Sequence, residues 1–280
     1  MKLHIATCRP LPEPDPDEDL LLAALQAVGI EATMDDWQDG GRWQDAAPTV
    51  VRSTWDYIHH LDAFRAWVTQ TAAAGPLWNP ADVLLDNLDK RYLFELAARG
   101  VPVVPTLLLE HGRPAGVAAR AAARGWEKVV IKPAVGAGSF ETHRVAAGSP
   151  EAAAICGRLL ADRDVLVQPY LSSVDGYGER ALVWIDGEFT HAVRKTPRFA
   201  ADAEQVSEAL PITAAERAVG TAALAPVRDR LLYARVDVAP GPTGDPVVME
   251  LELVEPSLFL LQSPSALERL VAGIRRRLVR

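Results

Sequence analysis

The chain has 280 residues, of which 49% are apolar and 24% charged, a composition that excludes a disordered or collagen-like protein and suits one to three compact domains. The net charge of −8 argues against general binding to nucleic acid, and no apolar run approaches the ~18–20 residues of a membrane-spanning helix. Two cysteines cannot build a disulfide framework, so we expect a cytoplasmic protein that binds neither nucleic acid nor membrane.

The first half of the chain alternates strand patterns with helix patterns. Glycines 29 and 100 are expected to end two of the helices, and a Pro-rich acidic loop follows the first strand. This alternation predicts an α/β fold with a parallel sheet that has helices on its faces. In chain order the predicted elements are the strand Leu3–Ala6, the helix Asp19–Val28, the strand Thr49–Thr54, the helices Leu61–Ala74 and Leu88–Arg99, the strand Val101–Leu109 and the helix Pro114–Ala123.

The second half continues with more strands than helices. Asp186 and Gly187 lie between two strand patterns and predict a tight hairpin turn. Arginines at positions 275–277 suit the C-terminal end of the last helix. In chain order the predicted elements are the strand Lys128–Lys132, the helix Pro150–Ala161, the strands Asp164–Gln168, Arg180–Ile185 and Phe189–Arg194, the helix Ala214–Ala225, the strands Leu232–Ala239 and Val247–Val254, and the helix Ser265–Leu278.

The late strand Val247–Val254 carries two acidic residues with a spacing of two. Side chains alternate between the faces of a strand, so Glu250 and Glu252 share one face and Met249 lies on the other. Asp237 joins them if the preceding strand pairs with this one. Neighbouring carboxylates repel each other, and three hard oxygen donors suit Mg²⁺. The alternative is an edge strand with a solvated acidic face.

Two lysines lie where a phosphate group could bind. Lys132 ends a β-branched strand and precedes a loop that contains Gly136, Gly138 and Ser139. Glycines allow backbone N–H groups to approach phosphate oxygens, although a plain hairpin loop is the alternative. Lys90 lies in the first turn of a predicted helix, where the helix dipole disfavours a cation and a bound anion would offset this cost. A solvated lysine is the alternative there.

Further candidates lie at strand ends. In the segment Val165–Leu171, an apolar strand ends at Gln168. A hydrophobic slot at this strand end could hold a flat base, although the segment could also be an ordinary strand end. Arg194 and Lys195 end a strand and suit phosphate or carboxylate, with a solvated hairpin edge as the alternative. Arg235 shares a strand face with the aspartate two residues later and could hold an anion.

Polar residues also follow both predicted strands of the N-terminal segment. The carboxyl ends of strands in an open parallel sheet meet at one crevice, which would here suit a small zwitterion. Surface ion pairs are the alternative for the arginines, and a helix cap is the alternative for the aspartate. The candidate substrate-binding residues are Arg9, Arg52, Ser53, Thr54, Asp56 and Tyr57.

Taken in order, these segments resemble the ATP-grasp ligases over roughly residues 87–254. The chain before them resembles the substrate-binding N-terminal domain of the glutathione-synthetase-like branch. The segments Arg52–Tyr57 and His191–Pro197 look most like the branch that contains the D-cycloserine-forming cyclo-ligase. Glu252 is a departure, because glutathione-synthetase relatives often have Asn at its position.

The resemblance implies a role for each candidate. Lys90 and Lys132 would contact ATP phosphates, and the loop with Gly136, Gly138 and Ser139 would cover them. The other implied roles are an adenine slot of Gln168, Tyr170 and Leu171, a ribose contact at Glu179, magnesium ligands at Asp237, Glu250 and Glu252, and catalytic cations at Arg194, Lys195 and Arg235.

The resemblance also implies the architecture and the reaction. It predicts an N-terminal α/β domain over residues 1–80, a central ATP-grasp lobe over 81–167 and a C-terminal lobe with the metal site over 168–280. The function would be ATP- and Mg²⁺-dependent ligation of a carboxylate to nitrogen through an acyl phosphate, on a small amino-acid-like substrate. We favour ring closure of O-ureido-D-serine to D-cycloserine. An intermolecular amino-acid or peptide ligase and a non-catalytic ATP-binding regulator are the alternatives, and whether the protein is a homodimer stays open.

Overall fold

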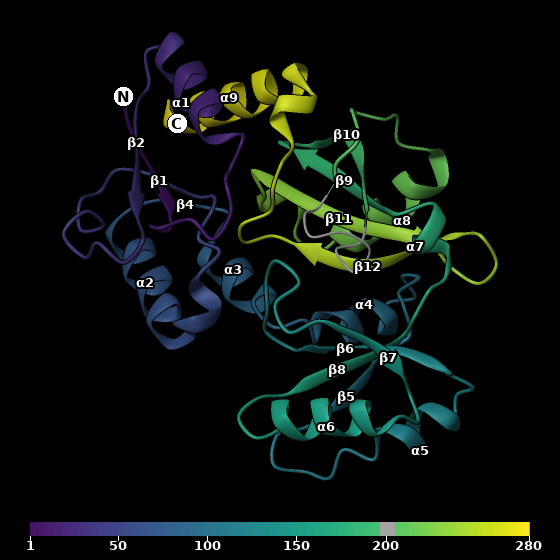
Figure 1. Ribbon diagram of the computed structural model, residues 1–280. Helices are drawn as coiled ribbons and strands as arrows, with labels where there is room; N and C mark the ends of the chain where they lie inside the picture. Colours follow the sequence, from purple (N-terminus) through teal and green to yellow (C-terminus); the bar gives the residue numbers. More distant parts are fainter. Residues whose placement is uncertain (197–204, 280) are drawn as a thin grey trace.

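The computed structural model describes residues 1–196 and 205–279 and arranges them around three four-stranded sheets (Figure 1). The N-terminal sheet has the strand order β2-β1-β3-β4 and is parallel throughout, as the sequence predicts. Two strands of this sheet, β2 and β4, were not predicted from the sequence. Its elements are β1 (Lys2–Thr7), α1 (Glu18–Ala27), β2 (Glu31–Asp36), β3 (Thr49–Val51), a 3₁₀ turn (Tyr57–His59), α2 (Leu61–Ala74) and β4 (Leu77–Trp78).

The central sheet has the order β5-β8-β6-β7 and is antiparallel. Its two helices lie on the face turned away from the rest of the chain (Figure 1). β7 was not predicted from the sequence either, and it pairs with the strand that ends near Lys132. The elements are β5 (Leu107–Leu109), α5 (Val117–Ala122), β6 (Lys128–Pro133), β7 (His143–Ala146), α6 (Pro150–Leu159) and β8 (Val165–Pro169).

The C-terminal sheet has the order β10-β9-β11-β12 and is also antiparallel. The predicted hairpin turn is present, with positive φ angles at Asp186 and Gly187. The elements are α7 (Ser173–Gly176), β9 (Glu179–Ile185), β10 (Glu188–Lys195), α8 (Ala214–Leu224), a 3₁₀ turn (Arg228–Arg230), β11 (Tyr233–Pro240), β12 (Pro246–Glu252), a 3₁₀ turn (Leu260–Gln262) and α9 (Pro264–Leu278).

The two faces of the C-terminal sheet pack against different partners. Apolar residues of one face, such as Val183 and Tyr233, share a core with the N-terminal sheet, α1 and α9. Residues of the other face, such as Trp184 and Val236, pack with α8 and with α4. This second core includes Leu93 and Leu96 of α4, so residues near position 90 are placed by the C-terminal sheet.

The segment between the N-terminal and central sheets differs from its prediction. The predicted helix Leu88–Arg99 is replaced by α3 (Ala81–Asn87) and α4 (Tyr92–Ala98), with Lys90 in the turn between them. The turn is held from a distance, because the backbone N–H of Lys90 donates to the carbonyl of Ala134 at 2.8 Å. Local periodicity cannot reveal a contact of that kind.

The predicted strand over residues 101–109 is shorter than expected. Only its last three residues form β5, and Val103 makes an isolated bridge to Val248 of β12. Pro102 and Pro105 lack backbone N–H groups, which explains why a continuous ladder does not form.

The three-domain division stays a prediction, and two features of the structure bear on it. The proposed boundary between residues 167 and 168 falls inside β8, so Gln168 belongs to a strand of the central sheet. Helices α1 and α9, from opposite ends of the chain, pack together (Figure 1).

Within the described ranges, no helix is both long and apolar enough to span a bilayer.

Candidate active site

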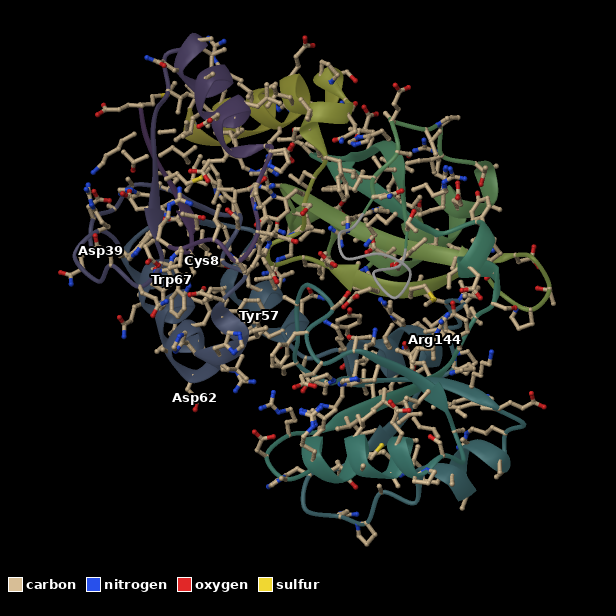
Figure 2. All side chains as sticks on the ribbon, in the orientation of Figure 1. Cys8, Asp39, Tyr57, Asp62, Trp67 and Arg144 are labelled. Atoms are coloured by element: carbon tan, nitrogen blue, oxygen red, sulfur yellow. The ribbon has the colours of Figure 1, made fainter. Side chains whose placement is uncertain are left out.

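A cavity of about 620 Å³ lies where the three sheets meet. The N-terminal segment contributes residues after β1 and after β3, the central sheet contributes β6, its following loop and the end of β8, and the C-terminal sheet contributes β9 to β12. Tyr57, one of the lining residues, lies between the N-terminal sheet and the rest of the chain (Figure 2). The predicted site residues that line this cavity are Asp56, Tyr57, Lys90, Lys132, Gly136, Gly138, Ser139, Gln168, Tyr170, Leu171, Glu179, Lys195, Arg235, Glu250 and Glu252.

The strand register brings the predicted carboxylates to one face of the C-terminal sheet. In the β11–β12 pair, Arg235 lies opposite Glu252 and Asp237 lies opposite Glu250. In the β9–β10 pair, Lys195 lies opposite Glu179. Side chains directly opposite each other share a face, so these six charged groups converge at the end of the sheet that meets the cavity.

Each carboxylate on this face has a cation beside it. Asp237 is almost fully buried and accepts hydrogen bonds from Lys195 at 2.7 Å and from Arg235 at 2.8 and 2.9 Å. Arg235 also pairs with Glu252, and Lys90 pairs with Glu250. Among the described residues, no three acidic, His or Cys side chains are grouped as a ready-made metal site. Lys90, Lys195 and Arg235 lie beside these carboxylates in the metal-free chain.

The charge pattern shifts the pKa values of the carboxyl groups in opposite directions. Burial alone would raise the pKa of Glu250, but Lys90 and Lys132 outweigh burial and hold that pKa at about 2. Burial raises the pKa of Glu252 to about 7, and Arg235 only partly opposes it. Burial likewise raises the pKa of Glu179 to about 7. The face therefore holds carboxylates with different proton affinities within one cavity.

The phosphate side of the cavity combines two lysines and the glycine loop. Burial lowers the pKa of Lys132, and the nearby negative charge of Glu250 opposes this shift. Lys90 donates to the carbonyl of Gly136 as well as to Glu250, which ties the loop to the carboxylate face. Positive φ angles at Gly138 and Ser139, of 56° and 63°, turn the loop back over the cavity.

The apolar side of the cavity matches the predicted slot for a flat base. Gln168 is buried and donates to the hydroxyl of Thr106 at 3.0 Å. Tyr170 and Leu171 form a small core with Met249. The position of Met249 corrects the alternation argument, because a bulge between Asp237 and Val238 in the register adds a residue to β12 and turns Met249 towards this slot.

Two of the solved structures that share this fold illustrate how much of the chain it covers. The crystal structure of D-cycloserine synthetase DcsG superposes with a TM-score of 0.91 and 34% identity, covering 99% of this chain and 100% of that one. The ATP-grasp ligase PsnB, complexed with minimal precursor, Mg and ADP, gives a TM-score of 0.64 at 20% identity, with 98% of each chain covered. The second likeness concerns the fold alone.

Sequence comparison decides the family. Residues 3–79 match the family described as the N-terminal domain of D-cycloserine synthetase DcsG. The chain is 36% identical over 282 residues to the cycloserine biosynthesis protein DcsG of Streptomyces lavendulae, with 94% of both chains covered. The chain is an ATP-grasp ligase of the DcsG family. The predicted α/β ATP-grasp fold and the predicted class, a carbon–nitrogen bond-forming ligase, are confirmed.

The structure of this ATP-grasp ligase places several predicted substrate-binding residues inside the fold. Arg52 is 2% exposed and donates to the carbonyl of Pro256 at 2.8 Å. Ser53 and Thr54 are fully buried, and the hydroxyl of Ser53 lies 2.8 Å from that of Thr7. Arg9 pairs with Glu18 on the surface. None of these predicted residues lines the cavity.

Asp56 and Tyr57 do line the cavity, but Asp56 is already hydrogen-bonded. Its two carboxylate oxygens accept from the indole N–H of Trp37 at 2.7 Å and from the amide of Gln38 at 2.8 Å. Asp56 directly precedes the 3₁₀ turn, as the alternative of a helix cap predicts, but its side chain makes no capping hydrogen bond to that turn.

Arg194 and Lys195 lie on opposite faces of β10. Lys195 faces the cavity, whereas Arg194 lies opposite Arg180, whose side chain pairs with Glu216 of α8. Adjacent residues of a strand cannot share a face, so only Lys195 reaches the cavity. The segment His191–Pro197 supported the resemblance to the cyclo-ligase branch, and its last residue, Pro197, lies outside the described residues.

The sequence argument missed several residues that line the cavity. His59, which the sequence did not single out, lines the cavity, and its ring meets Phe140 of the glycine loop edge to face at a centroid distance of 5.1 Å. Glu255, three residues beyond Glu252, also lines it. Its position after the end of β12 was the available signal, because ligand sites gather at strand ends.

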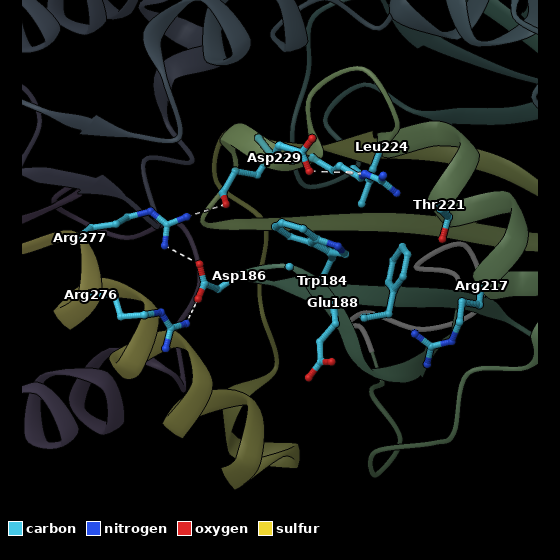
Figure 3. Close-up of a pocket in the computed structure, with 13 residues that line it drawn as sticks. Trp184, Asp186, Glu188, Arg217, Thr221, Leu224, Asp229, Arg276 and Arg277 are labelled. Atoms are coloured by element: carbon cyan, nitrogen blue, oxygen red, sulfur yellow. Dashed lines mark hydrogen bonds and ion pairs between the residues drawn. The ribbon is translucent and has the colours of Figure 1, made fainter. Parts of the chain in front are cut away.

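A second hollow of about 590 Å³ lies on the other face of the C-terminal sheet (Figure 3). Trp184 and Phe189 form its floor, and arginines surround it. Arg276 and Arg277 both pair with Asp186. No predicted site residue of the ATP-grasp ligase lines this hollow.

Proposed function

We propose that this ATP-grasp ligase closes O-ureido-D-serine to D-cycloserine, using ATP and Mg²⁺. The proposal is supported by the likeness to DcsG over the whole chain. It is also supported by the size of the cavity, which at about 620 Å³ falls in the range of small-molecule sites.

The observation that carries the proposal is the convergence of four cations on one cavity. Lys90 comes from the turn before α4, Lys132 from β6, Lys195 from β10 and Arg235 from β11. Four separate elements must fold together to gather these charges, and gathering them costs desolvation that a phosphate-bearing ligand would offset. A phosphoryl-transfer site needs this kind of positioning and charge neutralisation.

The proposed reaction has two steps. The substrate carboxylate attacks the γ-phosphate of ATP, and ADP leaves as an acyl phosphate forms. The nitrogen of the substrate's N–O bond then attacks the acyl carbon, phosphate leaves and the ring closes. The carbamoyl group, which D-cycloserine lacks, must leave with one water as carbon dioxide and ammonia.

The chain would serve this reaction by holding charges in place. Lys90, Lys132 and the N–H groups of the Gly136–Ser139 loop would bind the ATP phosphates. Lys195 and Arg235 lie beside the carboxylate face and would neutralise the acyl phosphate as it forms.

The donor set fits Mg²⁺ in its chemistry. Glu250, Glu252 and Asp237 supply hard carboxylate oxygens on one face, and the two glutamates are the more exposed, at 23% and 26% of their side chains against 1% for Asp237. Glu250 and Glu252 would hold magnesium, which when bound would supply positive charge to neutralise the phosphate groups. In the metal-free chain these glutamates pair with Lys90 and Arg235.

The nucleoside end of ATP would lie against the central sheet. Tyr170, Leu171 and Met249 offer a flat apolar wall beside the end of β8. Glu179 lies between this wall and Lys195, at 3.8 Å from the lysine, where a ribose hydroxyl could bind.

Product analysis tests the proposal. Incubation with ATP, Mg²⁺ and O-ureido-D-serine should release ADP, phosphate and ammonia in equal amounts and give D-cycloserine by mass spectrometry. Release of ADP only when a second amino acid or amine is added would favour an intermolecular ligase instead. ATP binding without release of ADP under any of these conditions would overturn the proposal.

A further inference from the structure

The acidic residues around the cavity differ in whether a cation accompanies them. Glu179, Glu250 and Glu252 each have a lysine or arginine within ion-pair distance. Glu255 lines the same cavity, and within residues 1–196 and 205–279 it forms no ion pair. Lysines and an arginine therefore line the phosphate end of the cavity, whereas the Glu255 carboxyl lies at the N-terminal end beside the hydroxyl of Tyr57.

The backbone around Glu255 is held by donors from other parts of the fold. The carbonyl of Val254 accepts from the hydroxyl of Tyr233 at 2.9 Å, and the carbonyl of Glu255 accepts from the indole of Trp55 at 3.1 Å. The carbonyl of Pro256 accepts from Arg52 at 2.8 Å. Three consecutive carbonyls are thus fixed, which positions the carboxyl before any ligand arrives.

The environment of the Glu255 carboxyl favours a cationic ligand. Burial and the nearby charge of Glu252 raise the pKa of Glu255 to about 8, while Lys90 and the hydroxyl of Tyr57 oppose the shift. A positive group that bound beside this carboxyl would oppose the shift and favour its ionised form. Asp56, the other carboxylate at this end, already accepts a hydrogen bond on each oxygen.

We propose that Glu255 binds the α-ammonium group of the amino-acid substrate and thereby directs the substrate carboxylate towards the lysines at the phosphate end. This inference rests on the proposed function in one respect, namely that the substrate is an amino acid. It assigns substrate specificity to the segment after β12, where the C-terminal sheet meets Trp55 and Tyr57 of the N-terminal segment.

The test compares a substrate with its desamino analogue. Glu255→Gln keeps the size of the side chain and removes the charge. Steady-state kinetics with O-ureido-D-serine and with 3-(ureidooxy)propanoate, which lacks only the amino group, give the preference for the ammonium group in each enzyme. Glu151→Gln, an exposed acid in the first turn of α6, is the matched control. Thermal melting identifies variants that are merely unfolded.

We expect the wild type to prefer the amino substrate by roughly 10- to 150-fold in kcat/KM, the loss that removal of one charged hydrogen bond predicts. Glu255→Gln should lower kcat/KM for the amino substrate to nearly the value for the analogue, mainly through KM, with ATP affinity unchanged. Glu151→Gln should keep the wild-type preference.

A folded Glu255→Gln that keeps the full preference would overturn the inference. So would a loss confined to kcat with the preference intact, which would make Glu255 a proton acceptor. If the enzyme turned over a different amino acid, the proposal of D-cycloserine formation would be wrong. The same comparison, made with that amino acid and its desamino form, would still decide the role of Glu255. An enzyme that accepted only substrates without an amino group would overturn both proposals.

Discussion

The two faces of the C-terminal sheet form hollows of similar volume, about 620 and 590 Å³, but of different chemical character. On the cavity face, charges from separate strands converge and stay partly open to the hollow, as Glu250 and Glu252 do. On the other face, arginines lie around an aromatic floor, and two of them, Arg276 and Arg277, form ion pairs with Asp186 (Figure 3). Volume therefore does not identify the site, whereas convergence of charge from several elements does.

The largest effect should come from the carboxylate that both lysines approach. Glu250→Gln removes a proposed magnesium donor and the partner of Lys90, so we expect turnover to fall by at least about 1,000-fold, in line with loss of a group that neutralises charge at the transition state. Coupled measurement of ADP release checks this. Undiminished turnover would refute the role of Glu250.

The stability of the same variant corrects an expectation from the sequence. Two neighbouring glutamates suggested that the substitution would relieve repulsion and stabilise the metal-free protein. Because Lys90 pairs with Glu250 in the structure and is only 12% exposed, Glu250→Gln should instead destabilise it, by about 1–3 kcal/mol. Denaturant titration without magnesium distinguishes the two signs.

The next effect concerns the support behind the cavity. Arg52→Ala should reduce the free energy of unfolding by about 3 kcal/mol, because it leaves the carbonyl of Pro256 and the buried carboxyl of Asp17, 3.9 Å from Arg52, without their cation. Chemical denaturation measures this loss. Arg52→Lys, which keeps the charge, should recover part of it. Normal stability together with a raised substrate KM would restore the earlier prediction of direct substrate binding.

A smaller effect should follow from the phosphate end. Lys132→Ala should weaken ATP binding roughly 10- to 150-fold, the range expected for one charged hydrogen bond. Lys132→Arg should not fully restore binding, because a planar guanidinium does not replace a point charge. Calorimetry with a non-hydrolysable ATP analogue gives both values, and unchanged affinity in the alanine variant would remove Lys132 from the site.

The smallest effect should come from the opposite face. Arg276→Gln breaks an exposed ion pair with Asp186 that Arg277 can still maintain, so stability should change by less than about 1 kcal/mol and turnover should not change. A loss of activity comparable to that of Lys132→Ala would show that the second hollow is coupled to the reaction.

Much of the candidate site follows from local patterns. The spacing of Glu250 and Glu252 placed both on one face, and Lys132 before a glycine loop was identified from a strand ending in a cation. The same reasoning failed where an irregularity intervened, as at Met249, where a bulge turns the side chain. It also failed for Arg52, because an arginine at a strand end looks the same whether it faces a ligand or a distant carbonyl.

The sequence by itself determined the parallel N-terminal sheet, the hairpin at Asp186, most helix bounds and the order of the phosphate and carboxylate motifs. These depend on periodicity, turn residues and spacing, which are local properties of the chain. Only the tertiary structure decided that Lys90 lies in a turn beside Glu250, that Arg194 faces away from the cavity that Lys195 lines, and that Glu255 lines that cavity. Those outcomes depend on which distant groups meet, because a charge acquires its role from the partners that the fold brings within a few ångströms of it.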